Sequence, residues 1–178
     1  MAEIRPHSPV LLLLGAFSRY PAALDWARQQ ASAVWGPVAL ASAVFPFADT
    51  AFYEASMGPG LQKVFWAFEN LVAPELLVEA KCLTNGWEAR YRTLSGGPEP
   101  RPLNLDPGYL TEAKLVLATT KDRDHRLYLG RGIFAEVTLY YQRTAGWQAR
   151  EWTYPDYRSA AYQAFLQQCR DYLRRKKP

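Results

Sequence analysis

The sequence predicts a single α+β domain built on a mixed or antiparallel sheet. Residues 10–17 (VLLLLGAF) form a continuous apolar run of strand length, which is typical of a strand covered on both faces. In residues 133–139 (IFAEVTL) every second side chain is apolar, and the opposite face carries Phe134, Glu136 and Thr138, as in a half-buried strand. The chain has 178 residues, of which 49% are hydrophobic and 21% charged, so it is long enough to bury a core of its own.

Strands and helices alternate in the first half of the chain. We expect residues 1–8 to be loose and residues 9–178 to form the domain. After the first strand, Pro21 begins a helix that Gly36 ends. Its apolar face consists of Leu24, Ala27, Ala31 and Val34.

Three extended segments and a second helix follow. The extended segments are residues 38–47, 51–57 and 61–71. Pro74 suits the first turn of a helix, whose apolar face continues to about Tyr91. Asn85 and Gly86 are a weak point at which this helix can end.

The order of these elements predicts the topology. Residues 95–102 (SGGPEPRP) are the clearest loop, and residues 103–105 read as a short strand. Strand, helix, strands, helix and strand over residues 10–105 are compatible with a ferredoxin-like βαββαβ portion. The remainder would extend that sheet with a hairpin and cover it with a C-terminal helix.

The second half carries the hairpin and the last helix. Residues 106–108 (DPG) fit the centre of a turn, and Thr111 can cap a short helix carrying Leu115, Val116 and Ala118. Residues 130–132 would join two strands, at residues 125–129 and 133–141.

Near the C-terminus, residues 152–154 read as extended and Asp156 as a cap for the last helix. That helix would begin at about Tyr157. Its inward face would consist of Tyr162, Phe165, Leu166, Cys169 and Leu173.

The net charge of +4 belongs to the C-terminus. Beside the single acid Asp171 stand Arg170, Arg174, Arg175, Lys176 and Lys177. Without these residues the chain is close to neutral, so it lacks the surface-wide positive field typical of proteins that track nucleic acid. The cluster either complements the dipole of the last helix or contacts RNA or another acidic partner.

Cysteine usage and hydropathy predict a cytoplasmic protein. Cys82 and Cys169 are too few for a disulfide framework and lack CxxC spacing, so we expect buried free thiols in a reducing compartment. The apolar run at residues 10–14 is far short of a membrane span and lacks a clear cleavage signal. We therefore expect no membrane partner.

Four sequence blocks resemble a known family. NLDPGYL, KLVLATTKDRDHRLYLGRGIFAEVTL and WTYPDYR are similar to signature blocks of the bacterial domain-of-unknown-function family 4416. FPFADTAFYEASMGPGLQKVFWAFENL resembles its N-terminal block. The resemblance covers nearly the whole chain. It implies the label "GTP-binding protein" that members often carry, with no reaction attached.

The motifs of common nucleotide-binding and catalytic folds are missing. The chain has no GxxxxGK[ST] loop, and Thr119-Thr120-Lys121-Asp122 gives only a hint of a guanine-reading motif, because Arg123 stands where that motif requires aspartate. GxSxG and GxGxxG are also missing. Clustered His or Cys ligands for zinc are lacking too.

Residues 104–138 instead collect side chains suited to phosphate recognition, which uses fixed cations and often a metal bridging carboxylates to phosphates. We expect phosphate to be bound by Lys114, Lys121, Arg126 and Arg131. Asp106 and Asp122 would hold a hard cation such as Mg²⁺.

Catalytic and base-stacking residues can be named for the same site. His125 is the candidate general acid/base, with Glu136 as its catalytic orienting partner or a metal ligand. Bases can stack on Trp152, Tyr154 and Tyr157. Simpler interpretations stay open: a solvated charged loop, a strand face open to water, a turn role for Asp106, and aromatic core packing.

The sequence supports two functions of different classes. The first is binding of a nucleotide or another phosphorylated ligand, with Mg²⁺ as candidate cofactor and phosphoester chemistry as candidate reaction. The second is a non-catalytic adaptor that binds RNA or a protein through its aromatic surface and basic C-terminal helix. The pattern leaves open whether the protein is an enzyme and how it assembles.

Overall fold

The computed structural model describes residues 3–47 and 53–176. The strands of this part form one antiparallel sheet, in the order β2-β4-β1-β5-β6-β8-β7, with β3 paired to β4 and β9 to β8. The strands are β1 (Val10–Ser18), β2 (Val38–Ala41), β3 (Phe45–Pro46), β4 (Gln62–Val72), β5 (Asn104–Leu110), β6 (Lys114–Thr119), β7 (Leu127–Gly130), β8 (Ile133–Gln142) and β9 (Gly146–Ala149). The helices are α1 (Pro21–Trp35), α2 (Glu54–Met57), α3 (Leu76–Ser95), the 3₁₀ helix η2 (Pro155–Arg158) and α4 (Ala160–Lys176).

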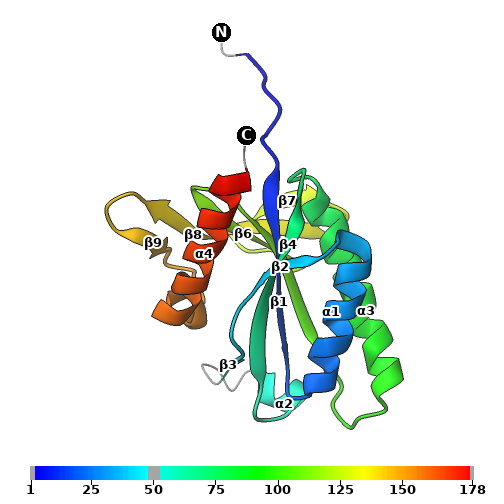
Figure 1. Cartoon of the computed structure of the whole chain (residues 1–178). Coiled ribbons are helices and arrows are strands. Elements are labelled where there is room, and N and C mark those ends of the chain that lie inside the picture. The colour runs from blue at the N-terminus through cyan, green and yellow to red at the C-terminus, as the bar shows by residue number, and fades with distance from the viewer. Residues whose placement is uncertain (1–2, 48–52, 177–178) are drawn as a thin grey trace.

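Strand β1 is buried on both faces, as its apolar run predicts. Leu12 and Leu14 pack in one core cluster with α1 and α3. Leu11 and Leu13 belong to a second cluster with α4. Figure 1 shows the same arrangement, with α1 and α3 on one face of the sheet and α4 on the other. Alternation along a strand thus lets one apolar segment hold two helical layers.

Helices α1 and α4 confirm their predicted patterns. Helix α1 begins at Pro21 and is followed by Gly36, whose φ of +92° favours glycine. Of its four expected apolar residues, Val34 is exposed and the others are buried. All five residues predicted to face inward from the last helix are buried.

Two segments of the first half settle or correct the predicted boundaries. Helix α3 does not end at Asn85 and Gly86 but continues past Tyr91 to Ser95. It continues because Trp87 is buried on its inner face, with its ring 5.2 Å from that of Trp35. The segment predicted as extended at residues 51–57 contains the short helix α2, while residues 51–52 lie outside the described residues.

Residues 106–108 form no turn, and the segment after Thr111 forms strand β6 rather than a helix. Strand β5 pairs with β1 along its whole length, from Asn104 opposite Phe17 to Leu110 opposite Leu11. This pairing outweighs the local turn preference. Pro107 fits because the N–H that it lacks would point away from β1, where no neighbouring strand needs it.

The predicted hairpin is confirmed as β7 and β8, joined by residues 131–132. Residues 152–154 form no strand. Asp156 does not cap α4: it lies in η2, and the Ser159 hydroxyl accepts the N–H of Tyr162 in the first turn instead. Residues 3–9 are exposed and extend away from the sheet (Figure 1). None of the described helices is both long and apolar enough to cross a membrane.

The sheet opens between β5 and β6. The two strands pair only from Gly108 opposite Leu117 to Leu110 opposite Leu115. Before Gly108 the two strands separate, and side chains of α3 bind the backbone groups of β5 that are not paired with β6. The Leu105 N–H donates to Glu88 Oε1 at 2.7 Å, and its carbonyl accepts from Lys81 Nζ at 2.8 Å. This opening positions the cavity described below.

Gly108 permits β5 and β6 to approach closely at the point where their pairing ends. A Cβ atom there would lie 2.5 Å from the Val116 carbonyl oxygen and 2.6 Å from Leu117 Cδ2. We predict that Gly108→Ala lowers the free energy of unfolding by about 1–3 kcal/mol, because the backbone must shift.

The matched control is Gly86→Ala on the exposed side of α3, where a Cβ would meet no atom within 4 Å. It should raise the free energy of unfolding by up to about 1 kcal/mol, because alanine favours a helix interior. Urea denaturation measures both variants. Equal effects of the two substitutions would show that the close approach of β5 and β6 does not require glycine at residue 108.

Candidate functional site

A cavity of about 510 Å³ lies where β5 and β6 separate. Its walls come from segments distant in sequence: the end of β1, α3, β5, the loop after β6, β8 and η2. The cationic side chains of its described walls are Lys63, Lys81, Arg101, Lys121, Arg123 and Arg126. The carboxylates are Asp106, Glu136 and Asp156. This excess of positive charge favours an anionic ligand.

Asp106 is held from two sides on the floor of the cavity. Its Oδ2 accepts a hydrogen bond of 2.7 Å from Asn104 Nδ2. Its Oδ1 lies 3.6 Å from Lys81 Nζ, and the side chain of Lys81 is only 6% exposed. The Asp106 side chain is 32% exposed, so this network presents a fixed carboxylate to the cavity.

Arg101 and Glu88 fix the other end of this network. Arg101 donates to Asn104 Oδ1 and, at 3.1 Å, to Glu88 Oε2. Burial raises the pKa of Glu88, although nearby Lys81 and Arg101 oppose the shift. In this series of hydrogen bonds, both the oxygen and the nitrogen of the Asn104 side-chain amide have partners.

Glu136 lies on β8 at the opposite wall and is 4% exposed. Arg126 Nε donates to its Oε2 at 2.8 Å, and the Thr138 hydroxyl donates to its Oε1 at 3.3 Å. His125 Nε2 lies 3.3 Å from the same Oε2. Arg126 also donates to the Lys121 carbonyl at 2.9 Å. Glu136 thus anchors the loop that brings Lys121 to the cavity.

Lys63 and Asp156 form a buried ion pair beside the floor. The distance from Lys63 Nζ to Asp156 Oδ2 is 2.6 Å, and the two side chains are 3% and 5% exposed. The ammonium group lies between 4.4 and 5.7 Å from the ring centroids of Phe17, Phe47, Phe65, Tyr157 and Tyr162. Ring faces and one carboxylate together compensate for removing this cation from water.

Tyr157 contributes a buried hydroxyl to the wall. The residue is 3% exposed, and its oxygen has no hydrogen-bond partner within the described part of the chain. Burial, with Asp156 and Asp106 nearby, raises its pKa well above the usual range, so the group stays protonated. Burial likewise raises the pKa of Tyr53 on the same wall to about 12. Tyr157 is thus a protonated donor that is closed to solvent and has no acceptor among the described residues.

The cavity gathers about half of the residues that the sequence predicts for the site. Its lining includes Asp106, Lys121, Arg126, Glu136, Tyr154 and Tyr157. His125 and Trp152 lie behind Glu136 and outside this lining; their rings stack with centroids 4.9 Å apart, and the Trp152 indole donates to the Val137 carbonyl.

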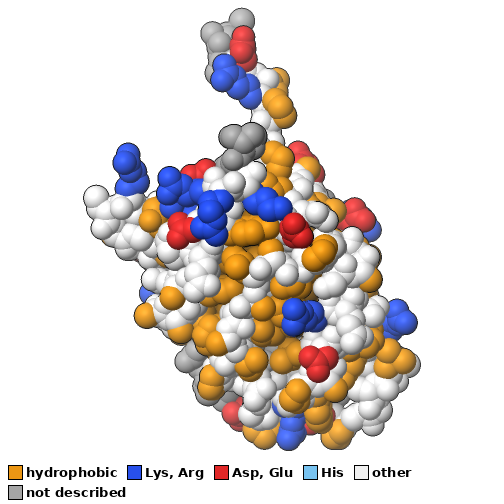
Figure 2. All heavy atoms as spheres, in the orientation of Figure 1, with side chains coloured by type: hydrophobic (Ala, Val, Ile, Leu, Met, Phe, Trp, Pro, Cys, Tyr) orange, Lys and Arg blue, Asp and Glu red, His pale blue; other side chains and the backbone are white. Residues whose placement is uncertain are grey.

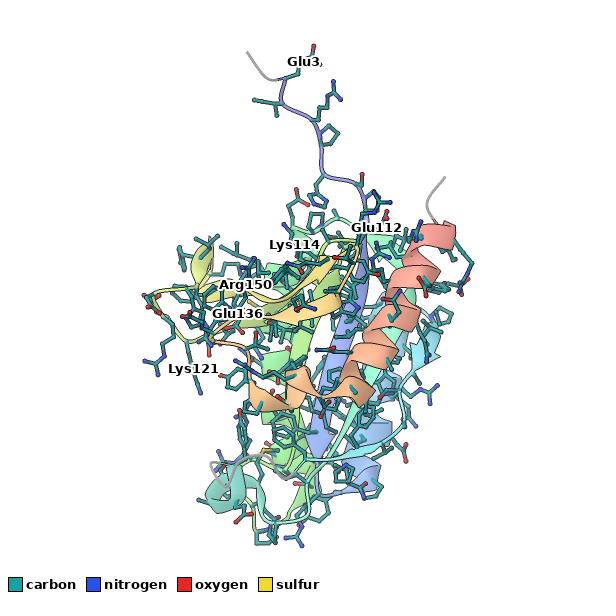
Figure 3. All side chains as sticks on the ribbon, turned by 90° about the vertical axis from the view of Figure 1, so that its left-hand side faces the viewer. Glu3, Glu112, Lys114, Lys121, Glu136 and Arg150 are labelled. Atoms are coloured by element: carbon teal, nitrogen blue, oxygen red, sulfur yellow. The ribbon has the colours of Figure 1, made fainter. Side chains whose placement is uncertain are left out.

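Lys114, Arg131 and Asp122 lie away from the cavity. Lys114 is at the opposite end of β6 from Thr119, and in Figure 3 it lies toward Glu112, with Glu136 between it and Lys121. Arg131 occupies the β7–β8 turn and lines a separate hollow beside α3. Asp122 is exposed in the loop after β6. Among the described residues, no group of three or more His, Cys, Asp or Glu is placed to hold a metal ion.

Comparison with known families agrees with the sequence blocks. Residues 8–172 match the model of the family described as Domain of unknown function (DUF4416). The chain belongs to this family. A search of curated proteins and a search of solved structures found no match.

Several cavity residues of this DUF4416 protein escape the sequence analysis. These are Phe17, Phe47, Tyr53, Lys63, Lys81, Arg101, Asn104 and Arg123. A signal exists for two of them. Lys63 shares one face of β4 with the apolar Phe65 and Ala67. Lys81 lies on the inner face of α3 with Leu77 and Thr84. Lysine is almost never fully buried unless it is paired, so a lysine on an apolar face marks a partner elsewhere in the fold.

We predict that breaking the buried pair is costly in this protein. Lys63→Met and Asp156→Asn should each lower the free energy of unfolding by about 3–5 kcal/mol, because a buried charge loses its partner. The double variant should lose much less than the sum of the single losses. Urea denaturation measures this double-mutant cycle.

Arg174→Met is the control for that cycle. Its pair with Glu112 is exposed, with 57% and 40% of the two side chains accessible, so little change is expected. Strictly additive losses at Lys63 and Asp156 would show that the two groups do not stabilise each other.

The raised pKa of Glu88 predicts a pH dependence. Because the folded state binds this proton more tightly than the unfolded chain, the contribution of Glu88 to stability falls as pH rises above its ordinary pKa of 4.5. Glu88→Gln should therefore gain stability relative to the natural protein as pH increases from 4.5 toward neutrality. Thermal melts across this range test it. Glu79→Gln, on the exposed side of the same helix, is the control, and a flat difference at Glu88 would refute the effect.

Proposed function

We propose that this DUF4416 protein binds a nucleotide or another phosphorylated small molecule in the cavity between β5 and β6. The charge of the walls is the observation that carries the proposal. Asp106, Glu136 and Asp156 each have a cation nearby, and Arg101 pairs with Glu88. Lys121 and Arg123 add further positive charge on the exposed loop.

The size and the donors of the cavity support the same proposal. A volume of about 510 Å³ falls within the range of roughly 300–1,000 Å³ that is usual for small-molecule sites. The Arg101 side chain is 38% exposed on the wall of the cavity, and a phosphate oxygen would accept from it. Tyr154, half-exposed at the rim, offers a ring on which a base can stack.

The local architecture also favours a site at this place. We propose that β2-β4-β1-β5, with α1 and α3 on one face, is a ferredoxin-like portion, on the grounds of its strand order and antiparallel pairing. The ligand would then sit beyond the β5 edge of this portion. Charged α3 side chains replace strand pairing at that edge, a local cost of the kind that proteins retain at functional sites.

Phosphoester chemistry is a further step of the proposal. His125 would serve as general acid/base and Glu136 as its partner, and Mg²⁺ would bind the ligand phosphates. Contact between His125 and Glu136 supports the pairing. Because His125 is outside the lining, it would act on the ligand through Glu136.

An adaptor function has one observation in its favour. The edge strand β7 exposes Leu127, Tyr128 and Leu129, and Trp152 is also partly exposed. The basic end of α4 gives it less support. Figure 2 shows Lys and Arg side chains gathered there with acidic side chains between them, and Arg174 and Lys176 pair with acids of this chain. Lys177 lies outside the described residues.

We predict that GDP with Mg²⁺ binds and stabilises the protein, and that loop cations carry much of the affinity. Lys121→Ala and Arg123→Ala should each weaken binding roughly tenfold or more, since a hydrogen bond to a charged group contributes about 1.5–3 kcal/mol. Isothermal titration calorimetry with GDP, ADP and pyrophosphate, with and without Mg²⁺, measures the affinities.

Lys114→Ala and Arg131→Ala are matched controls, because each removes one cation away from the cavity. Equal losses in the controls would refute this location. If no phosphorylated compound binds, but RNA binds with a salt dependence that weakens on neutralising Arg174 and Arg175, the adaptor function is correct.

A further inference from the structure

The cavity has two chemically different ends. Lys121 and Arg123 belong to the exposed loop that follows β6. Asp106 lies on the floor, where β5 faces the opening in the sheet. A phosphate group would be drawn toward the loop rather than the floor, where Asp106 and Glu88 offset the charges of Lys81 and Arg101. A ligand that fills the cavity would therefore lie with its anionic group toward the loop.

The floor carboxylate has unused capacity as an acceptor. A carboxylate offers about four lone-pair positions. The described contacts of Asp106 are one hydrogen bond from Asn104 and the nearby Lys81 ammonium. Asn104 has no freedom to turn away, because Arg101 holds its amide oxygen. Asp106 is thus oriented to accept from a further donor within the cavity.

The unused acceptor positions of Asp106 call for a ligand group that donates. Two neighbouring hydroxyls can each donate to an oxygen of one carboxylate. The oxygens of a fully ionised phosphate only accept, so they do not complement Asp106.

We infer that the ligand is a phosphorylated sugar whose neighbouring hydroxyls donate to Asp106, and not an inorganic polyphosphate. This inference rests on the proposed function and narrows its ligand class. The shared chemistry is a phosphate carried on a vicinal diol. A free sugar phosphate and the ribose of a nucleotide both present it, and the experiment separates them.

Calorimetry on the full chain tests the inference with four probes: ribose 5-phosphate, GDP, 2′,3′-dideoxy-GDP and pyrophosphate. GDP should bind roughly tenfold or more tightly than its dideoxy form, because the dideoxy form leaves Asp106 without a donor. Binding of ribose 5-phosphate as tight as that of GDP would assign the site to sugar phosphates. Weaker binding of ribose 5-phosphate would assign it to nucleotides.

Asp106→Asn should abolish the preference for GDP over dideoxy-GDP while keeping the affinity for pyrophosphate within a few-fold. Asp122→Asn, in the exposed loop, is the matched control and should keep the preference. Circular dichroism checks that each variant is folded. If Asp106→Asn does not fold, the ratio of GDP to dideoxy-GDP affinity in the natural protein decides alone.

Two results would overturn the inference. Equal binding of GDP and dideoxy-GDP, with pyrophosphate also bound, would leave the proposed function standing and refute the reading of hydroxyls by Asp106. Absence of binding by all four probes would refute the inference and the proposed function together.

Discussion

The separation of β5 from β6 is the constraint on which the site depends. An exposed strand edge must find partners for its backbone groups, and here α3 supplies them through Lys81 and Glu88. A lysine or glutamate side chain spans a greater distance than the hydrogen bond between two paired strands. Replacing strand pairing by these side chains therefore leaves space between β5 and β6. Lys81, which bonds the β5 backbone, also lies beside Asp106 at the floor of that space.

Buried charge is distributed around the cavity in matched sets. The ammonium of Lys63 is enclosed by aromatic rings and Asp156, and Glu136 is bonded by Arg126 and Thr138. Such pairs add less stability than apolar packing of equal volume would, because each charge loses its hydration. Their value lies in fixed geometry. They hold η2 against β4 and the loop after β6 against β8.

One side of the site is predictable from the sequence and the other is not. Lys121, Arg126 and Glu136 lie close together in sequence, so one segment displays them. Lys63, Lys81 and Asp156 come from β4, α3 and η2, which meet only in the folded chain. Lys114 shows that closeness in sequence can also mislead. It is near Lys121 in sequence, but the extended strand β6 separates the two side chains.

Periodicity and apolar content in the sequence determined β1, β4, α1, α4 and the β7–β8 hairpin, because local patterns of burial suffice to define them. Membership of the family also follows from the sequence blocks. Only the tertiary structure decided that residues 106–108 continue a strand and that residues 114–119 form β6, since pairing with β1 and β8 overrides the local preferences for a turn and a helix. The cavity belongs to the same category: it exists because two strands part, and no pattern within either strand records the distance between them.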